Sequence, residues 1–135
     1  MSTIKGMSGE PTQEFIADVF DRNCPSRHTM EVVAGKWGTL ALVALREGTF
    51  RFNALRRKVD GVSEKMLAQT LQALERDGLV LREAQKTIPP HVEYSLTSLG
   101  ARVADRLFAL IEVLEDSFSD VQAARARYEE SHPLG

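Results

Sequence analysis

The sequence of 135 residues has one cysteine, Cys24, and no apolar run close to the ~20 residues that a membrane-spanning helix needs. A single cysteine excludes an internal disulfide framework and is typical of a reducing cytoplasm, where we expect the protein. The first twelve residues lack the apolar segment of a secretory signal. Glycine and proline are scarce, and a content of 43% hydrophobic and 27% charged residues is typical of one globular domain.

Patterns of catalytic and metal sites are also missing. His28, His91 and His132 lie far apart, without the cysteine or carboxylate spacing of a zinc site. The stretch GKWGT at 35–39 only faintly resembles a phosphate-binding loop, because the leading glycine is missing and Trp37 stands where serine or threonine is needed. We therefore expect no enzyme, no cofactor and no metal.

The net charge of −2 argues against an anionic partner, but its distribution does not. Residues 1–21 hold one basic residue against four acidic ones, and residues 97–135 hold four against seven. Residues 22–96 hold twelve against eight, so the basic excess lies in the middle of the chain. A local basic surface of this kind can bind phosphate groups even when the protein as a whole is slightly acidic.

Apolar spacing and helix-breaking residues predict the order of elements. We expect helices over 12–21, 26–34, 37–47, 54–59 and 63–78, a short extended piece at 49–52, strands at 79–84 and 92–96, and a last helix from about 97 to 122. Asn53 and Ser63 are the expected N-caps. Residues 1–11 and 123–135 read as tails around one domain over 12–122. Two short helices followed by a hairpin predict a winged helix-turn-helix, a mainly α fold with a small β-hairpin.

Six strings resemble the HxlR-type winged-helix regulators of bacteria, which are related to the MarR regulators. They are CP at 24–25, GKW at 35–37, RFNALRR at 51–57, VSEKML at 62–67, LERDGL at 74–79 and PPHVEYSLT at 89–97. The resemblance covers residues 24–121. It implies a homodimeric transcriptional regulator that binds a pseudo-palindromic promoter site and dimerises through its first and last helices.

Two apolar stripes fit that dimer contact, although they could instead pack on their own domain. Their residues are Phe15, Ile16, Val19, Phe20, Val103, Leu107, Leu110, Leu114, Phe118 and Val121.

Helix 63–78 has leucines on one side and polar residues on the other, which suits a DNA major groove. Glutamine can offer a donor and an acceptor to adenine, and lysine can reach guanine. The expected base-reading residues are Ser63, Lys65, Met66, Gln69 and Thr70. Gln72 would contact base or backbone, and Arg76 would meet backbone or water.

The hairpin loop is basic, so the wing over 82–92 is expected on the DNA backbone or in the minor groove. Its residues are Arg82, Lys86 and His91, with Arg82 alternatively pairing with Glu83 or Glu93. Further phosphate contacts are expected from Lys36, Arg51, Arg56 and Arg57. The alternative function is a winged helix that binds only proteins.

Cys24 precedes Pro25 at a helix start, with Arg22, Arg27 and His28 nearby. A helix start and cations favour the reactive thiolate. Several relatives in the resembled family have a cysteine here that senses oxidants or electrophiles, and the resemblance implies the same for Cys24. The alternative is a small buried apolar residue.

Overall fold

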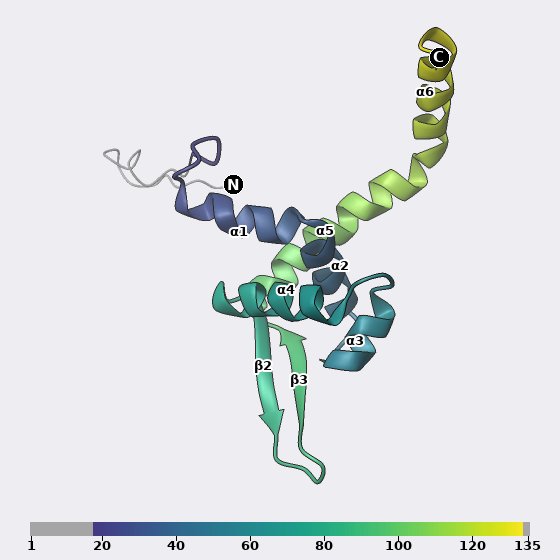
Figure 1. Cartoon of the computed structure of the whole chain (residues 1–135). Coiled ribbons are helices and arrows are strands. Elements are labelled where there is room, and N and C mark those ends of the chain that lie inside the picture. The colour runs from purple at the N-terminus through teal and green to yellow at the C-terminus, as the bar shows by residue number, and fades with distance from the viewer. Residues whose placement is uncertain (1–17, 134–135) are drawn as a thin grey trace.

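The computed structural model describes residues 18–133 (Figure 1). The elements are α1 (Pro25–Ala34), α2 (Lys36–Leu45), β1 (Phe50–Arg51), α3 (Phe52–Lys58), α4 (Glu64–Arg76), β2 (Val80–Gln85), β3 (His91–Leu96), α5 (Ser98–Asp116) and α6 (Phe118–Ser131). Their order confirms the predicted winged helix-turn-helix, with α3 and α4 as its two short helices.

Helix α2 lies at the centre of the apolar core. Its sequence is apolar nearly all round, and four of its residues, Ala41, Leu42, Ala44 and Leu45, are buried as predicted. The leucines of α4 at 67, 71 and 74 are buried in the same cluster. The core therefore holds α4 by one side and leaves its other side outward.

Helix α4 is fixed at both ends. The Oγ atom of Ser63 accepts the backbone N–H of Met66 at 3.1 Å, which confirms the predicted N-cap. Gly78 ends the helix in the left-handed region, with φ of 80°, where glycine is strongly favoured. Strand β2 begins two residues later, so the hairpin follows the helix directly.

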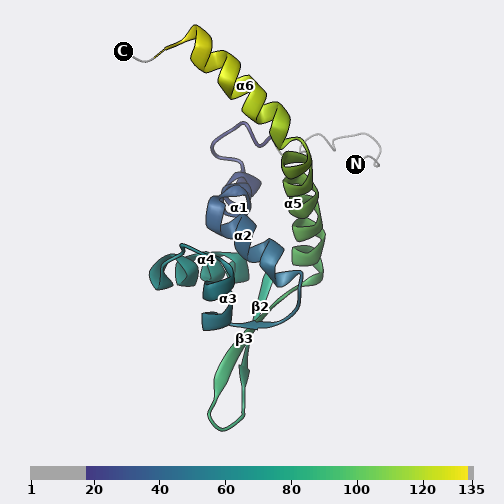
Figure 2. The same ribbon diagram turned by 90° about the vertical axis from the view of Figure 1, so that its right-hand side faces the viewer.

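The strands form one antiparallel sheet in the order β1-β3-β2. The hairpin of β2 and β3 confirms the predicted wing, and both views show it projecting beyond the helices (Figures 1 and 2). The short piece at 49–52 contributes β1, in which Phe50 pairs with Tyr94 of β3. The wing is thereby anchored to the helix-turn-helix at its base.

The prediction of a first helix over 12–21 is wrong for residues 18–21, the part of it that the structure describes. Residues 12–17 lie outside the described part, and residues 18–24 form turns. The carboxylates of Asp18 and Asp21 accept the backbone N–H groups of Phe20 and Asn23 at 3.1 and 2.9 Å. These local bonds compete with helix formation, so α1 begins only at Pro25.

The predicted cap at Asn53 is also wrong. Helix α3 begins at Phe52, its N-cap is Arg51, and no side chain caps it. Phe52 is half-buried against the core, whereas Asn53 is exposed. Packing of the phenyl ring therefore sets where this helix starts.

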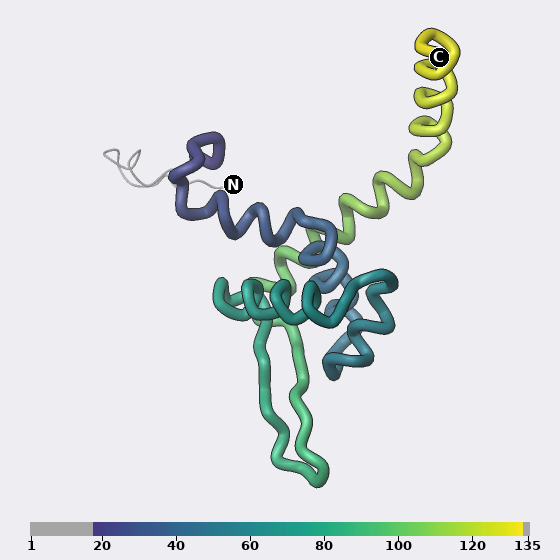
Figure 3. Tube along the Cα trace, viewed as in Figure 1, coloured from purple at the N-terminus to yellow at the C-terminus, as the bar shows by residue number. Residues whose placement is uncertain are grey.

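The last helix is divided and extends farther than predicted. It breaks at Ser117, and α6 continues to Ser131 through residues expected to be a tail. The sequence QAARARYEE at 122–130 has strong helix formers but no apolar stripe, which explains the error. The start of α5 packs against the core, and the green-to-yellow trace in Figure 3 shows the rest of α5 and α6 leading away from it.

Candidate nucleic-acid interface

The outward side of α4 carries long polar side chains that are free to meet a ligand. Lys65, Gln69 and Gln72 are exposed, and no hydrogen bond or ion pair among residues 18–133 engages them. Ser63 at the helix start is exposed as well. The core holds the opposite side of α4, so these groups are presented by a rigid rod. We call Lys65, Gln69 and Gln72 the polar face.

One flank of the polar face borders the corner between α1 and α2. Met66, Gln69 and Thr70 line an open groove of about 270 Å³ there, together with Lys36 and Trp37. The ammonium of Lys36 lies 4.5 Å from the centre of the Trp37 ring, a cation–π contact. Met66 is 41% exposed and Thr70 is half-buried, so both border the face without occupying its centre.

The other flank borders the wing. Gln72 and Arg82 line a recess of about 380 Å³ with Tyr94, which stands opposite Arg82 in the sheet register. No ion pair within residues 18–133 joins Arg82 to Glu83 or Glu93. Gln72 and Arg82 therefore lie together on an exposed surface that runs from α4 to the sheet.

The side chain of Arg76 contacts other residues of the protein. Its Nη2 atom donates to the Nε2 atom of His28 on α1 at 2.9 Å, and its Nε atom lies 3.5 Å from Asp77. The second oxygen of Asp77 accepts the hydroxyl of Thr29 at 2.9 Å. No sequence pattern predicted these contacts, because the partners lie 48 positions apart in the chain.

The wing has a basic and an apolar group near its tip. Lys86 is exposed, and Ile88 is 100% exposed. His91 is half-buried at the base of the loop, where its ring nitrogens contact Thr87 at 3.1 Å and Glu93 at 3.0 Å. The structure thus gives His91 partners within the wing, which shape the loop that presents Lys86.

A second basic area lies between β1, α3 and β3. Arg51, Arg57 and His91 line a recess of about 390 Å³ there. Arg51 and Arg57 are exposed and form no ion pair within residues 18–133. Arg56 lies 3.9 Å from Glu64, a distance at which its charge is partly offset. These four predicted phosphate-binding residues therefore fall into two groups, with Lys36 and Arg56 beside α4 and with Arg51 and Arg57 beside the wing.

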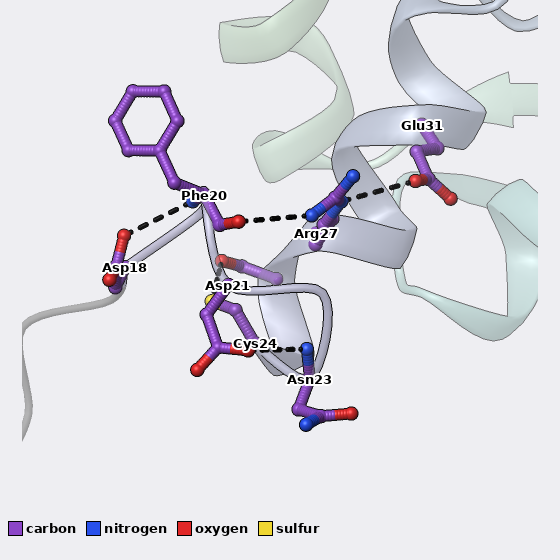
Figure 4. Close-up of polar contacts among 8 residues, drawn as sticks. Asp18, Phe20, Asp21, Asn23, Cys24, Arg27 and Glu31 are labelled. Atoms are coloured by element: carbon purple, nitrogen blue, oxygen red, sulfur yellow. Dashed lines mark hydrogen bonds and ion pairs between the residues drawn. The ribbon is translucent and has the colours of Figure 1, made fainter.

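Cys24 is the N-cap of α1 and is half-buried. Its sulfur lies 3.2 Å from the hydroxyl of Ser26. The Ser26 hydroxyl lowers the pKa of the Cys24 thiol, and backbone N–H groups of Ser26 and Arg27 at the helix start add to this. The expected help from cations is not found: Arg27 points to the Phe20 carbonyl at 3.1 Å and to Glu31 at 3.4 Å (Figure 4).

The helix-turn-helix, the hairpin that follows it and the exposed polar face of α4 together define a winged-helix transcriptional regulator that binds DNA. More narrowly, the chain belongs to the HxlR-like helix-turn-helix family, whose model matches residues 32–122. None of the helices in residues 18–133 has the length and apolar character needed to cross a membrane.

The chain is similar to the HTH-type transcriptional regulator YtfH of Escherichia coli. The two are 55% identical over 108 residues, which are 80% of this chain and 86% of YtfH. The solved structure of YtfH from Salmonella typhimurium has a TM-score of 0.77 at 52% identity and covers 82% of this chain and 99% of that one. Both likenesses span the helix-turn-helix and the wing.

The chain is also similar to the solved structure of the redox regulator HypR in its oxidised form. Its TM-score is 0.63 at 36% identity, and the match covers 69% of this chain and 96% of HypR. Members of this structural group therefore include a protein described as a redox regulator.

Proposed function

We propose that the protein is a homodimer that reads a pseudo-palindromic DNA site, with α4 of each copy in the major groove. The main support for this proposal is the exposed polar face, which lies opposite the buried leucines. Its side chains have no partner among residues 18–133. A B-DNA major groove admits one α-helix, and its base edges present donors and acceptors to such side chains.

Within the groove, Lys65 reaches guanine, and Gln69 makes the paired donor and acceptor contact to adenine. Ser63, Met66 and Thr70 contact the site from the first turns, Met66 through its apolar side chain. Gln72 contacts base or backbone at the wing side. Arg76 contributes less than expected because His28 and Asp77 already engage it.

The wing provides phosphate contacts beside the groove. Six residues of β2 at ~3.3 Å each span ~20 Å, close to the ~17 Å that separate a major groove from the next minor groove. Lys86 therefore reaches the backbone or the minor groove next to the bases that α4 reads. Further phosphate contacts come from Lys36, Arg51, Arg56, Arg57 and Arg82, while His91 supports the wing from within.

The dimer contact uses the outer part of the last helices and the segment before α1. Val103 and Leu107 pack against the core of their own domain, so this first part of the predicted stripe is already covered within one copy. Leu110, Leu114 and Phe118 are 53%, 53% and 43% exposed. Val121 is half-buried, and Phe20 is 91% exposed. Exposed large apolar side chains, which here lie on α5, on α6 and before α1, favour association with a second copy.

Selection of bound duplexes from a random DNA pool tests this function. We expect a two-fold symmetric consensus and a binding constant that falls steeply with salt, because about 0.9 counterion is released for each phosphate contact. Recovery of no consensus together with weak, salt-insensitive binding would instead favour a winged helix that binds proteins.

We also propose that an oxidant or electrophile acts on the DNA affinity through Cys24. The lowered thiol pKa and the likeness to HypR support this assignment. Since no second cysteine exists in the chain, the product is an adduct, a mixed disulfide or a disulfide between subunits. DNA binding is to be measured with and without diamide or N-ethylmaleimide. A Cys24→Ser protein that responds as strongly as the parent would exclude the assignment.

A further inference from the structure

Four residues tie the end of α4 to α1, and we call them the α1–α4 joint: His28, Thr29, Arg76 and Asp77. The Thr29 hydroxyl donates to Oδ2 of Asp77 at 2.9 Å. Arg76 lies 3.5 Å from Oδ1 of the same carboxylate and donates to His28 at 2.9 Å. Two residues of each helix therefore share one contact network.

Asp77 is the centre of this joint. Its side chain is only 19% exposed, whereas that of Arg76 is 61% exposed, and both of its carboxylate oxygens have partners. A hydrogen bond to a charged group is directional, whereas apolar packing is not. Leu67, Leu71 and Leu74 hold the body of α4 by such packing. The joint adds directional contacts to α1 at the C-terminal end of α4, beside the Thr97 hydroxyl of the α5 N-cap, which donates to the Gly78 carbonyl at 2.6 Å.

On its other side α1 is tied to the segment that precedes it. Arg27 donates from Nη1 to the Phe20 carbonyl at 3.1 Å while its Nε atom lies 3.4 Å from Glu31 (Figure 4). Phe20 belongs to the proposed dimer contact and is 91% exposed. A continuous set of contacts thus runs from Phe20 through α1 and Thr29 to the end of α4.

We infer that the Thr29–Asp77 bond sets the half-site spacing that the dimer accepts. Thr29 and Asp77 are then positioning residues, which hold each α4 at a fixed angle to the dimer contact and do not touch DNA. Inserting one base pair moves a half-site by about 3.4 Å and rotates it by about 35°, so a dimer with fixed helices cannot follow. This inference rests on the proposed function, since it requires a dimer with two recognition helices.

The test compares three duplexes: the site selected by the parent protein, and that site with one base pair inserted or removed at its centre. The parent is expected to bind the altered spacings about tenfold more weakly. Thr29→Val removes the hydroxyl and keeps the side-chain shape. It should bind all three duplexes within about threefold of one another while still rejecting a duplex with a changed half-site.

Two control variants distinguish a positioning role of the Thr29 hydroxyl from a general effect on the stability of the protein. Thr29→Ser keeps the hydroxyl and should restore the discrimination between spacings. Thr39→Val removes a different threonine bond, from Thr39 to the Val33 carbonyl, and should keep the parent's discrimination. Thermal unfolding followed by circular dichroism confirms that each variant is folded.

The outcomes are distinct. If Thr29→Val keeps the parent's tenfold ratio, or weakens binding to all three duplexes equally, the joint does not set the spacing. If the parent itself ignores changes within the half-sites, the proposed function fails, whatever the joint does.

Discussion

The Sγ atom of Cys24 lies 3.2 Å from the Oγ atom of Ser26, two residues farther along the chain at the start of α1. The Ser26 hydroxyl donates to the thiolate and so lowers the pKa of Cys24. We predict that Ser26→Ala raises this pKa. The thiolate then forms only at higher pH, and alkylation near neutral pH becomes slower.

The measurement is the rate of reaction with iodoacetamide between about pH 6 and pH 10, where the half-maximal rate reports the thiol pKa. Ser26→Thr keeps a hydroxyl and should react like the parent. Identical profiles for Ser26→Ala and the parent would show that this contact does not tune the thiol.

Gln69 and Lys65 are expected to carry base preference. Replacing either by alanine should cost about 1–3 kcal/mol on the selected site, because a paired contact to a base edge is lost, and should leave binding to random DNA nearly unchanged. Titrations with labelled duplexes measure both. Gln122→Ala, at an exposed position on α6, is the matched control and should bind like the parent. Unchanged preference in Gln69→Ala would mean that another surface reads the bases.

The fold could be predicted wherever one local rule dominated. The leucines of α4 recur at helical spacing and Ser63 precedes them, so both the buried side and the cap were predictable. At 18–21 the apolar spacing also suggested a helix, but Asp18 and Asp21 form turns that the spacing does not reveal. Helix α6 was missed for the opposite reason, since it has helix-forming residues without an apolar stripe.

The candidate site was predictable in its exposed parts and not in its internal contacts. The helical period places Lys65 and Gln69 on the side of α4 opposite the leucines, so the sequence marks them as groups that could meet DNA. The engagement of Arg76 by His28 depends on how two distant helices pack. One sequence without coordinates contains no signal for such a pair.

Lys86 at the wing should affect all DNA sequences alike. Lys86→Ala removes one phosphate contact, so affinity should fall on selected and random duplexes by similar factors, and the slope of log K against log salt should shrink by about 1. Lys58→Ala is a matched control, because Lys58 pairs with Glu47 at 2.8 Å and belongs to neither group of proposed phosphate contacts. A loss confined to the selected site would give Lys86 a role in base reading instead.

Leu114 lies on the exposed part of the last-helix stripe. Leu114→Asp would place a carboxylate in the proposed dimer contact, and burial of an unpaired charge is strongly unfavourable. We therefore predict a shift from dimer to monomer in sedimentation experiments at micromolar protein concentrations. The same change at Leu81, which is 45% exposed on β2, should leave the dimer intact. A dimeric Leu114→Asp protein would exclude this stretch of α5 from the contact.

Gly100 allows α5 to approach the turn after α4. A Cβ atom built there would lie 1.9 Å from the Leu79 carbonyl oxygen, which already accepts the N–H of Thr97 at 3.1 Å. Gly100→Ala must therefore push α5 away from a backbone group that cannot rotate aside, and should lower the free energy of unfolding by about 1–3 kcal/mol. Urea unfolding followed by circular dichroism measures this loss.

Gly35→Ala is the control. A Cβ atom at Gly35 would lie 3.1 Å from its nearest backbone atom, so this change should cost less stability, because a small shift relieves the contact. Equal unfolding midpoints for Gly100→Ala and the parent would mean that α5 does not need this close approach, and that its orientation to the wing is set elsewhere.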